Sequence, residues 1–173
     1  MNSTERVSRI IQGKSVDRHP IYGWVYPNMK DKIDKAYGSA AAFEDKYEFD
    51  AAHIFGGPCS FKQDFLEREE LTPDILLESD CFTSPDCLDD YQNIVDELKH
   101  HKQRGRFCYV QTPGFFENFN SVFGIENQLM YLALYPEELG ELYRKQADWT
   151  IRFAGHCIDL GVDMVHISDD WGA

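Results

Sequence analysis

The stretch that decides the fold is Gly161-Val162-Asp163-Met164-Val165-His166-Ile167-Ser168-Asp169-Asp170-Trp171-Gly172-Ala173. A long amphipathic helical pattern runs into Gly161, and the apolar run 164–167 after it predicts a short strand. Two adjacent carboxylates, Asp169 and Asp170, follow this strand, and no further helix covers it. In proteins with parallel strands, ligands gather where the strands end at their carboxyl side. We therefore expect a functional edge at these carboxylates and a chain that is part of a larger architecture.

The composition is typical of a globular protein with its own core. The chain has 173 residues, of which 43% are hydrophobic and 27% charged. The net charge of −13, with no basic stripe, argues against nucleic acid and against an anionic membrane surface as partners. No apolar run approaches the roughly 20 residues that cross a bilayer, and the N-terminus lacks the apolar core of a signal peptide. We therefore expect a cytoplasmic protein.

The five cysteines form neither a CxxC motif nor a Cys-x-His pair. Their scattered positions predict reduced thiols and give no metal ligand within the chain.

Hydrophobic periodicity and capping residues predict alternating helices and strands. We expect strands over 21–26, 50–55, 106–111 and 164–167, and helices over 2–13, 28–38, 39–47, 84–105, 115–123, 125–135 and 136–160. The segment 59–83 has no clean period and is expected to be a loop with a small irregular element. In the helix that begins at Ser84, the expected buried face is Leu88, Tyr91, Ile94, Val95 and Leu98. In the last helix it is Leu139, Leu142, Ala147, Ile151, Ala154 and Ile158.

Each predicted strand is reached through a helix, with no hairpin signal between strands. This alternation predicts an α/β fold with a parallel sheet. No strand end has a GxGxxG or GxxxxGK[ST] motif, so a nucleotide-binding open sheet is disfavoured. A complete TIM barrel has eight strand–helix units and typically about 250 residues. We therefore expect the N-terminal half of a TIM (β/α)8 barrel, with four parallel strands and their helices in one partial domain over 1–173.

Three segments of the chain together resemble one family. They are the opening 1–7 with 13–21, the segment Pro113-Gly114-Phe115-Phe116-Glu117, and the end Gly161-Val162-Asp163 with 167–172. This combination resembles the uroporphyrinogen decarboxylase-like superfamily, and the likeness covers most of the chain outside 59–83. The resemblance implies a TIM barrel with one of two activities. One branch removes the acetate carboxylates of uroporphyrinogen in tetrapyrrole biosynthesis, without a cofactor. The other moves a methyl group between a corrinoid protein and a thiol or another acceptor, usually with zinc.

The sequence departs from the decarboxylase branch in the segments that would bind substrate. Decarboxylases have Met-Arg-Gln-Ala-Gly-Arg after the first strand, whereas this chain has 22–28, Tyr-Gly-Trp-Val-Tyr-Pro-Asn, with no arginine. Asn120, four residues before Gly124, stands where a tyrosine is expected. An octacarboxylate without arginines at its site would be poorly held. We therefore expect a corrinoid-linked methyltransferase first and a true decarboxylase second.

The cofactors implied by the methyltransferase branch belong to the full-length protein. Its zinc ligands, a His-x-Cys and a distant Cys, are in the second half of the barrel. We therefore expect no cofactor within this chain, with zinc and a corrinoid possible only for the full-length protein.

Asp169 and Asp170 are the candidate catalytic residues. At the carboxyl end of a strand, either would accept a hydrogen bond from substrate or act as a general acid or base. The alternative is that both cap a following helix.

The expected substrate-binding residues lie on the other strands and turns. Tyr22, Trp24 and Tyr26 alternate on the first strand and so share a face, which suits a flat tetrapyrrole or corrinoid but also ordinary barrel packing. Two strand histidines would either line the interior or be core residues. The predicted substrate-binding set is Tyr22, Trp24, His53, Glu117, His166 and Trp171.

A third hypothesis comes from a different class of function. The chain would be a catalytically inert half-barrel, because the outer edges of its first and fourth strands would be unpaired. We therefore expect a homo-oligomer or association with a second half-barrel, and a small-molecule or corrinoid-protein substrate for the assembled enzyme.

Overall fold

The sheet has four parallel strands in the order in which they follow each other along the chain. The computed structural model describes residues 1–66 and 71–170, so the predicted site residue Trp171 lies outside the described residues. The strands are β1 (Tyr22–Gly23), β2 (Ala51–Ile54), β3 (Phe107–Pro113) and β4 (Met164–Ser168), and their spatial order is β1-β2-β3-β4. All three pairings are parallel. The predicted α/β class with four parallel strands is therefore confirmed.

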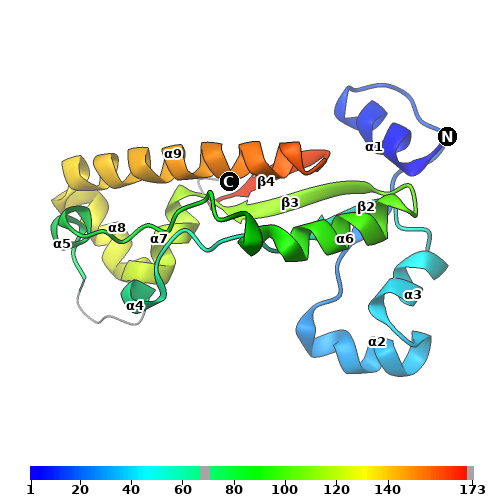
Figure 1. Ribbon diagram of the computed structural model, residues 1–173, viewed down its shortest axis with the longest axis horizontal. Coiled ribbons are helices and arrows are strands. Elements are labelled where there is room, and N and C mark those ends of the chain that lie inside the picture. The colour runs from blue at the N-terminus through cyan, green and yellow to red at the C-terminus, as the bar shows by residue number, and fades with distance from the viewer. Residues whose placement is uncertain (67–70, 171–173) are drawn as a thin grey trace.

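Helices connect the strands and flank the sheet (Figure 1). The helix α1 (Ser3–Ile11) precedes β1, and η1 (Pro27–Met29), α2 (Lys30–Tyr37) and α3 (Ala40–Lys46) lead to β2. Between β2 and β3 lie α4 (Gln63–Leu66), α5 (Pro73–Glu78), η2 (Leu88–Tyr91) and α6 (Gln92–Lys102). Between β3 and β4 lie α7 (Phe115–Phe123), α8 (Ile125–Leu134) and α9 (Pro136–Asp159).

Local capping explains several helix boundaries that the sequence predicted. The Asn2 side chain accepts a hydrogen bond of 2.7 Å from the Glu5 N–H and begins α1. The Ser39 hydroxyl accepts one of 3.0 Å from Ala42 and begins α3. Gly38 ends α2 with a φ of 88°, a backbone conformation that favours glycine.

Two predicted elements differ from the structure. The strand expected over 21–26 is only β1, because its ladder with β2 is limited to the pairs Tyr22–Ala51 and Gly23–Ala52. The helix expected to begin at Ser84 begins as the 3₁₀ turn η2 and becomes α-helical only at Gln92. The Ser84 hydroxyl instead accepts a hydrogen bond from Asp86, two residues on, and so closes a local turn.

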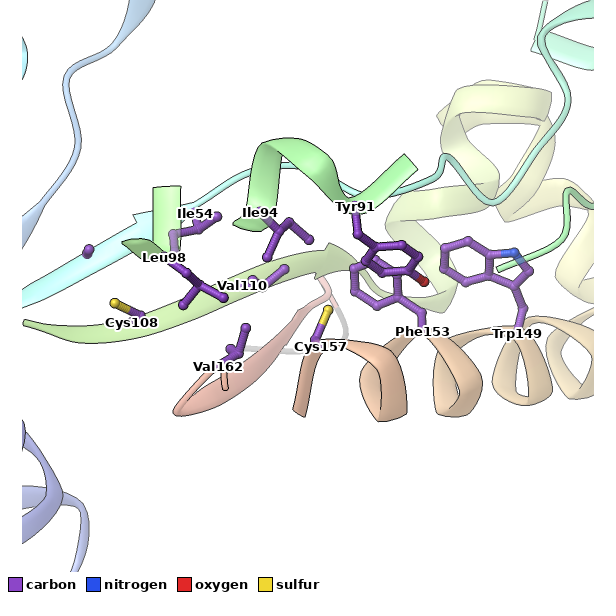
Figure 2. Close-up of a cluster of buried hydrophobic side chains, with 11 residues drawn as sticks. Ile54, Tyr91, Ile94, Leu98, Cys108, Val110, Trp149, Phe153, Cys157 and Val162 are labelled. Carbon is purple, nitrogen blue, oxygen red and sulfur yellow. The ribbon is translucent and has the colours of Figure 1, made fainter. Parts of the chain in front are cut away.

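The main core lies between the sheet and the helices α6 and α9 (Figure 2). Every second residue of β2 and β3 points into it. The aromatic rings come from α9, which supplies Trp149 and Phe153, and from η2, which supplies Tyr91. Its buried members are Ala52, Ile54, Tyr91, Ile94, Leu98, Cys108, Val110, Trp149, Phe153, Cys157 and Val162.

For four residues, the prediction that they are buried on a helix's core-facing side is wrong. Leu88 and Val95 are 66% and 36% exposed, because the buried stripe runs through Tyr91, Ile94, Leu98 and His101. On α9, Ile151 and Ile158 are 69% and 63% exposed. There the buried stripe continues from Leu142 at helical spacing, through Gln146, Trp149, Phe153 and Cys157. The predicted phase was therefore right for the first two turns of α9 and wrong after them.

The amino ends of the strands are fixed by buried ion pairs. Asp50, fully buried just before β2, accepts hydrogen bonds from the guanidinium groups of Arg6 and Arg18, each at 2.5 Å, and from the Ile21 N–H at 2.8 Å. These contacts hold the pKa of the Asp50 carboxyl below its usual range despite its burial, which acts in the opposite direction. Just before β3, Arg106 contacts Glu44 at 2.8 Å. These pairs attach α1 and α3 to the sheet.

Candidate functional site

One face of the sheet carries four of the six predicted substrate-binding residues, and we call it the inner face. It is opposite α6 and α9 and is formed by Tyr22, Trp24, His53, Tyr109 and His166. Its position follows from strand alternation, since the intervening residues point into the main core. Near the amino end, α1 packs on this face through Val7 against Ala51, Phe107 and Tyr109. Farther along the strands, Trp24 and Tyr22 are 38% and 63% exposed, and His166 is exposed.

Aromatic rings surround His53 on the inner face. The His53 ring stacks on Tyr109 with a centroid distance of 4.7 Å and an angle of 17°. The Trp24 ring meets it edge-on at 4.8 Å, and Phe55 lies 4.0 Å from it. The predicted pair of Trp24 and His53 is therefore brought together. Tyr26 extends the group, at 5.4 Å from Trp24.

His53 is a polar group without a hydrogen bond in this setting. Both of its ring nitrogens are buried and have no hydrogen-bond partner in the described part of the chain. Burial lowers the pKa of His53 below its ordinary value, and the nearby His166 lowers it further. The imidazole is therefore a buried polar group enclosed by aromatic rings, with two unpaired nitrogens among the described residues.

The inner face also has an apolar hollow near α1. Its volume is about 280 Å³, and its walls include Ile11, Tyr22, Tyr109, Met164 and His166. Two of the predicted binding residues, Tyr22 and His166, thus lie on the same concave surface.

Asp169 lies at the carboxyl end of β4, but its carboxylate is bound to the first turn of α7. It accepts hydrogen bonds from the N–H groups of Phe115, Phe116 and Glu117 at 2.7, 3.2 and 3.0 Å. The backbone approaches closely at Gly114, where a Cβ would overlap the Asp169 carboxylate. Asp169 is therefore the N-cap group of α7, supplied from a distant part of the chain.

Asp170 and Glu117 have different surroundings from Asp169. Asp170 is exposed, and its N–H donates to the Asp169 carboxylate at 3.1 Å. Glu117 lies in the first turn of α7, and one of its carboxylate oxygens is buried with no hydrogen-bond partner among the described residues. The carboxyl edge therefore has three carboxylates in sequence positions 117, 169 and 170, of which only Asp169 has its acceptor capacity taken up by the backbone.

Tyr109 is the inner-face residue that sequence reasoning missed. It is 6% exposed, stacks on His53 and lies 6.3 Å from the His166 ring. The signal was present in the alternation of Phe107, Tyr109 and Gln111 along the third strand. Burial of the phenol raises the pKa of Tyr109 to about 12.

Residues 1–66 and 71–170 contain neither a cluster of metal-binding side chains nor a helix suited to cross a membrane. No group of three or more His, Cys, Asp or Glu side chains in these ranges is placed to hold a metal ion. None of the helices in the same ranges combines the length and the apolar character needed to cross a membrane.

No protein-family model and no curated protein matches this chain.

Proposed function

We propose that this chain is the N-terminal half of a uroporphyrinogen decarboxylase-like barrel, and that the assembled barrel is a corrinoid-linked methyltransferase. The observation that supports the proposal is the difference between the two faces of the sheet. Four parallel strands follow each other in chain order, and α6 and α9 cover one face. On the other face α1 packs only near the amino end, and beyond it the face presents aromatic rings and histidines. In a TIM barrel all helices lie outside and the opposite face of the sheet lines the interior.

The inner face suits a flat ligand. The partly exposed Trp24 ring meets His53, and the exposed Tyr22 and Tyr26 extend this surface. The buried Tyr109 ring stacks on His53 and supports it. Aromatic side chains bind planar molecules through large apolar contacts. A corrinoid supplies a cobalt centre that accepts and donates a methyl group, and these side chains would pack against its macrocycle.

The positions of the arginines favour methyl transfer over decarboxylation. Arg6, Arg18 and Arg106 lie at the amino ends of the strands, and each is paired with a carboxylate. None of the inner-face residues defined above is an arginine. Substrate carboxylates would require unpaired arginines at the carboxyl ends, where ligands of such sheets bind. True uroporphyrinogen decarboxylation is therefore the second candidate within this family.

Zinc does not fit the residues at hand. In the described ranges no set of His, Cys, Asp or Glu is placed to hold a metal ion. Zinc would therefore bind outside this half of the barrel.

The inert half-barrel is a candidate from another class, and one observation favours it. Asp169, a predicted catalytic residue, is engaged as the cap of α7. In this case the chain provides structure and associates with a copy of itself or with a second half-barrel. Sedimentation of the purified chain tests it, because a monomer at micromolar concentration would count against association.

Binding of cobinamide, a corrinoid without a nucleotide tail, tests the methyltransferase proposal. Tryptophan fluorescence reports binding, with uroporphyrin III as the competing tetrapyrrole. We expect saturable quenching by cobinamide and weaker binding of uroporphyrin, because the octacarboxylate finds no free arginine on the inner face.

A pair of variants places the binding on the inner face. Trp24→Ala removes one ring of the flat surface and should weaken cobinamide binding roughly ten-fold. Equilibrium dialysis measures the affinity of both variants, because this substitution also removes the fluorescent ring. Ile151→Ala is the matched control, since Ile151 is 69% exposed on the outer side of α9. Equal affinities in the two variants would refute the inner face as the site, and tighter binding of uroporphyrin would favour the decarboxylase.

A further inference from the structure

A second hollow lies at the carboxyl ends of β2 and β3, and we call it the neutral pocket. It has a volume of about 320 Å³. Its walls come from the loop after β2, the end of β3, α7 and α9, and they include Gly57, Ser60, Phe61, Asn118, Trp149 and Phe153. The volume is at the lower end of the roughly 300–1,000 Å³ found for small-molecule sites.

The loop after β2 is held in place, so the neutral pocket is preformed. The Asn93 amide donates to the Phe55 carbonyl at 2.5 Å. The Thr83 hydroxyl donates to the Cys59 carbonyl at 2.5 Å, and the Thr83 N–H donates to Ser60 at 2.9 Å. These bonds fix both ends of the loop to the segment that leads into α6.

Gly57 lets this loop pass close to α9. Its φ of +84° favours glycine, and a Cβ there would lie 2.6 Å from the Phe153 ring. The wall formed by Phe153 and Trp149, whose rings stack at 5.3 Å, therefore directly faces the loop backbone.

The polar side of the pocket is a buried chain of neutral groups. Ser60 and Asn118, which are 8% and 7% exposed, are hydrogen bonded at 2.8 Å. Asn118 also donates to Gln146 at 2.8 Å, and Gln146 donates to Thr150 at 3.3 Å. The Ser60 hydroxyl in turn donates to the Asn118 amide oxygen at 3.1 Å. Its proton is therefore engaged within the chain, and its second lone pair is left at the pocket wall as an acceptor.

Among the described residues that line the pocket, none is charged. An ionic ligand would lose its hydration there without gaining a counter-charge, which is costly in a partly buried site. An uncharged ligand would place its apolar part against Phe61, Trp149 and Phe153 and bond its polar group to Ser60.

We infer that the neutral pocket binds a small uncharged molecule with an apolar, ring-sized body and one hydroxyl group, which donates to Ser60. This inference goes beyond the proposed function, because the pocket is formed by other residues than the inner face and would exist in either branch of the family. Gln111 lines the pocket and pairs in register with His166, so a bound molecule lies beside the inner face at the carboxyl edge.

Benzyl alcohol is the probe, and the chain contains an internal control for it. Cys59 lines the pocket and is exposed, whereas Cys87 is exposed elsewhere. Mass spectrometry would follow alkylation of both thiols by iodoacetamide. We expect millimolar benzyl alcohol to slow alkylation of Cys59 several-fold and to leave Cys87 unchanged, and equal concentrations of benzoate or benzylammonium to have no effect.

Two variants test the polar and apolar sides separately. Ser60→Ala removes one hydroxyl and should weaken benzyl alcohol about five-fold, with toluene unaffected. Ser121→Phe, at an exposed position on the pocket rim, should reduce protection by both probes, and Gln103→Phe, exposed at the end of α6, is its matched control. Equal effects on Cys59 and Cys87, or protection by benzoate as strong as by benzyl alcohol, would overturn the inference.

Discussion

Replacing Asp169 by alanine separates a structural carboxylate from a catalytic one. The Asp169 carboxylate accepts hydrogen bonds from the N–H groups of Phe115, Phe116 and Glu117. Loss of a capping side chain costs about 1 kcal/mol of stability, and loss of a negative charge at a helix N-terminus costs about 0.3–1 kcal/mol more. We therefore expect Asp169→Ala to lower the free energy of unfolding by roughly 2 kcal/mol.

Urea unfolding followed by circular dichroism at 222 nm measures this loss. Asp170→Ala is the matched control, because Asp170 is exposed and its carboxylate makes no contact with α7 in the bonds described above. Its effect should stay within about 0.5 kcal/mol. Asp169→Asn retains an acceptor oxygen and should lie between the two.

The result also decides how Asp169 is interpreted. If Asp169→Ala and Asp170→Ala have the same stability, the cap does not stabilise α7, and the structural reasoning is refuted. If Asp169→Ala is the less stable by the expected margin, any loss of ligand binding in that variant follows first from displacement of α7. Asp170 then becomes the carboxylate to test for chemistry.

Three further predictions concern stability and thiol reactivity. Burial and the neighbouring Arg106 lower the pKa of His101 from 6.5 to about 4, so the folded state resists protonation of this side chain. As the pH falls from 6.5 to 4, the free energy of unfolding should therefore fall by up to about 3 kcal/mol. His101→Gln should remove most of that fall, as measured by urea titrations at each pH. With a thiol reagent, Cys59 and Cys87 should react rapidly, and the three buried cysteines should react only on unfolding. Rapid reaction of all five thiols in the folded protein would contradict the burial of Cys81, Cys108 and Cys157. Gly57→Ala should lower the melting temperature by several degrees, because the new Cβ meets the Phe153 ring; an unchanged temperature would show that the loop moves freely.

The sequence predicted the class of the fold because its signals were local. Helix caps at Asn2 and Ser39 were readable, and the helix–strand alternation gave the parallel sheet. The phase of α9 was not readable after its second turn, since Ile151 and Trp149 are both apolar and only tertiary packing decides which is buried. The same holds for Val95 in α6.

The sequence predicted which side chains of one strand share a face, but not which residues of different segments contact each other at the candidate site. Strand alternation grouped Tyr22, Trp24 and Tyr26, and the rings of Trp24 and Tyr26 lie 5.4 Å apart. The contact of Trp24 with His53 joins the segment after β1 to β2, and alternation within one strand does not indicate it. The capping of α7 by Asp169 joins residues more than 50 positions apart, and no local pattern indicates it. The neutral pocket was missed for the same reason, because its walls come from four separate segments.

The strand order has a consequence for how the chain is made. Each strand pairs with the strand synthesised before it, and β3 pairs with β2 over residues 107–110 and with β4 over residues 109–113. The sheet is therefore able to grow one strand at a time as the polypeptide leaves the ribosome, without waiting for a distant segment. The two-residue strand β1 gains least from this growth, since it is attached by two residue pairs only. Its amides should exchange with solvent deuterium well before those of β3.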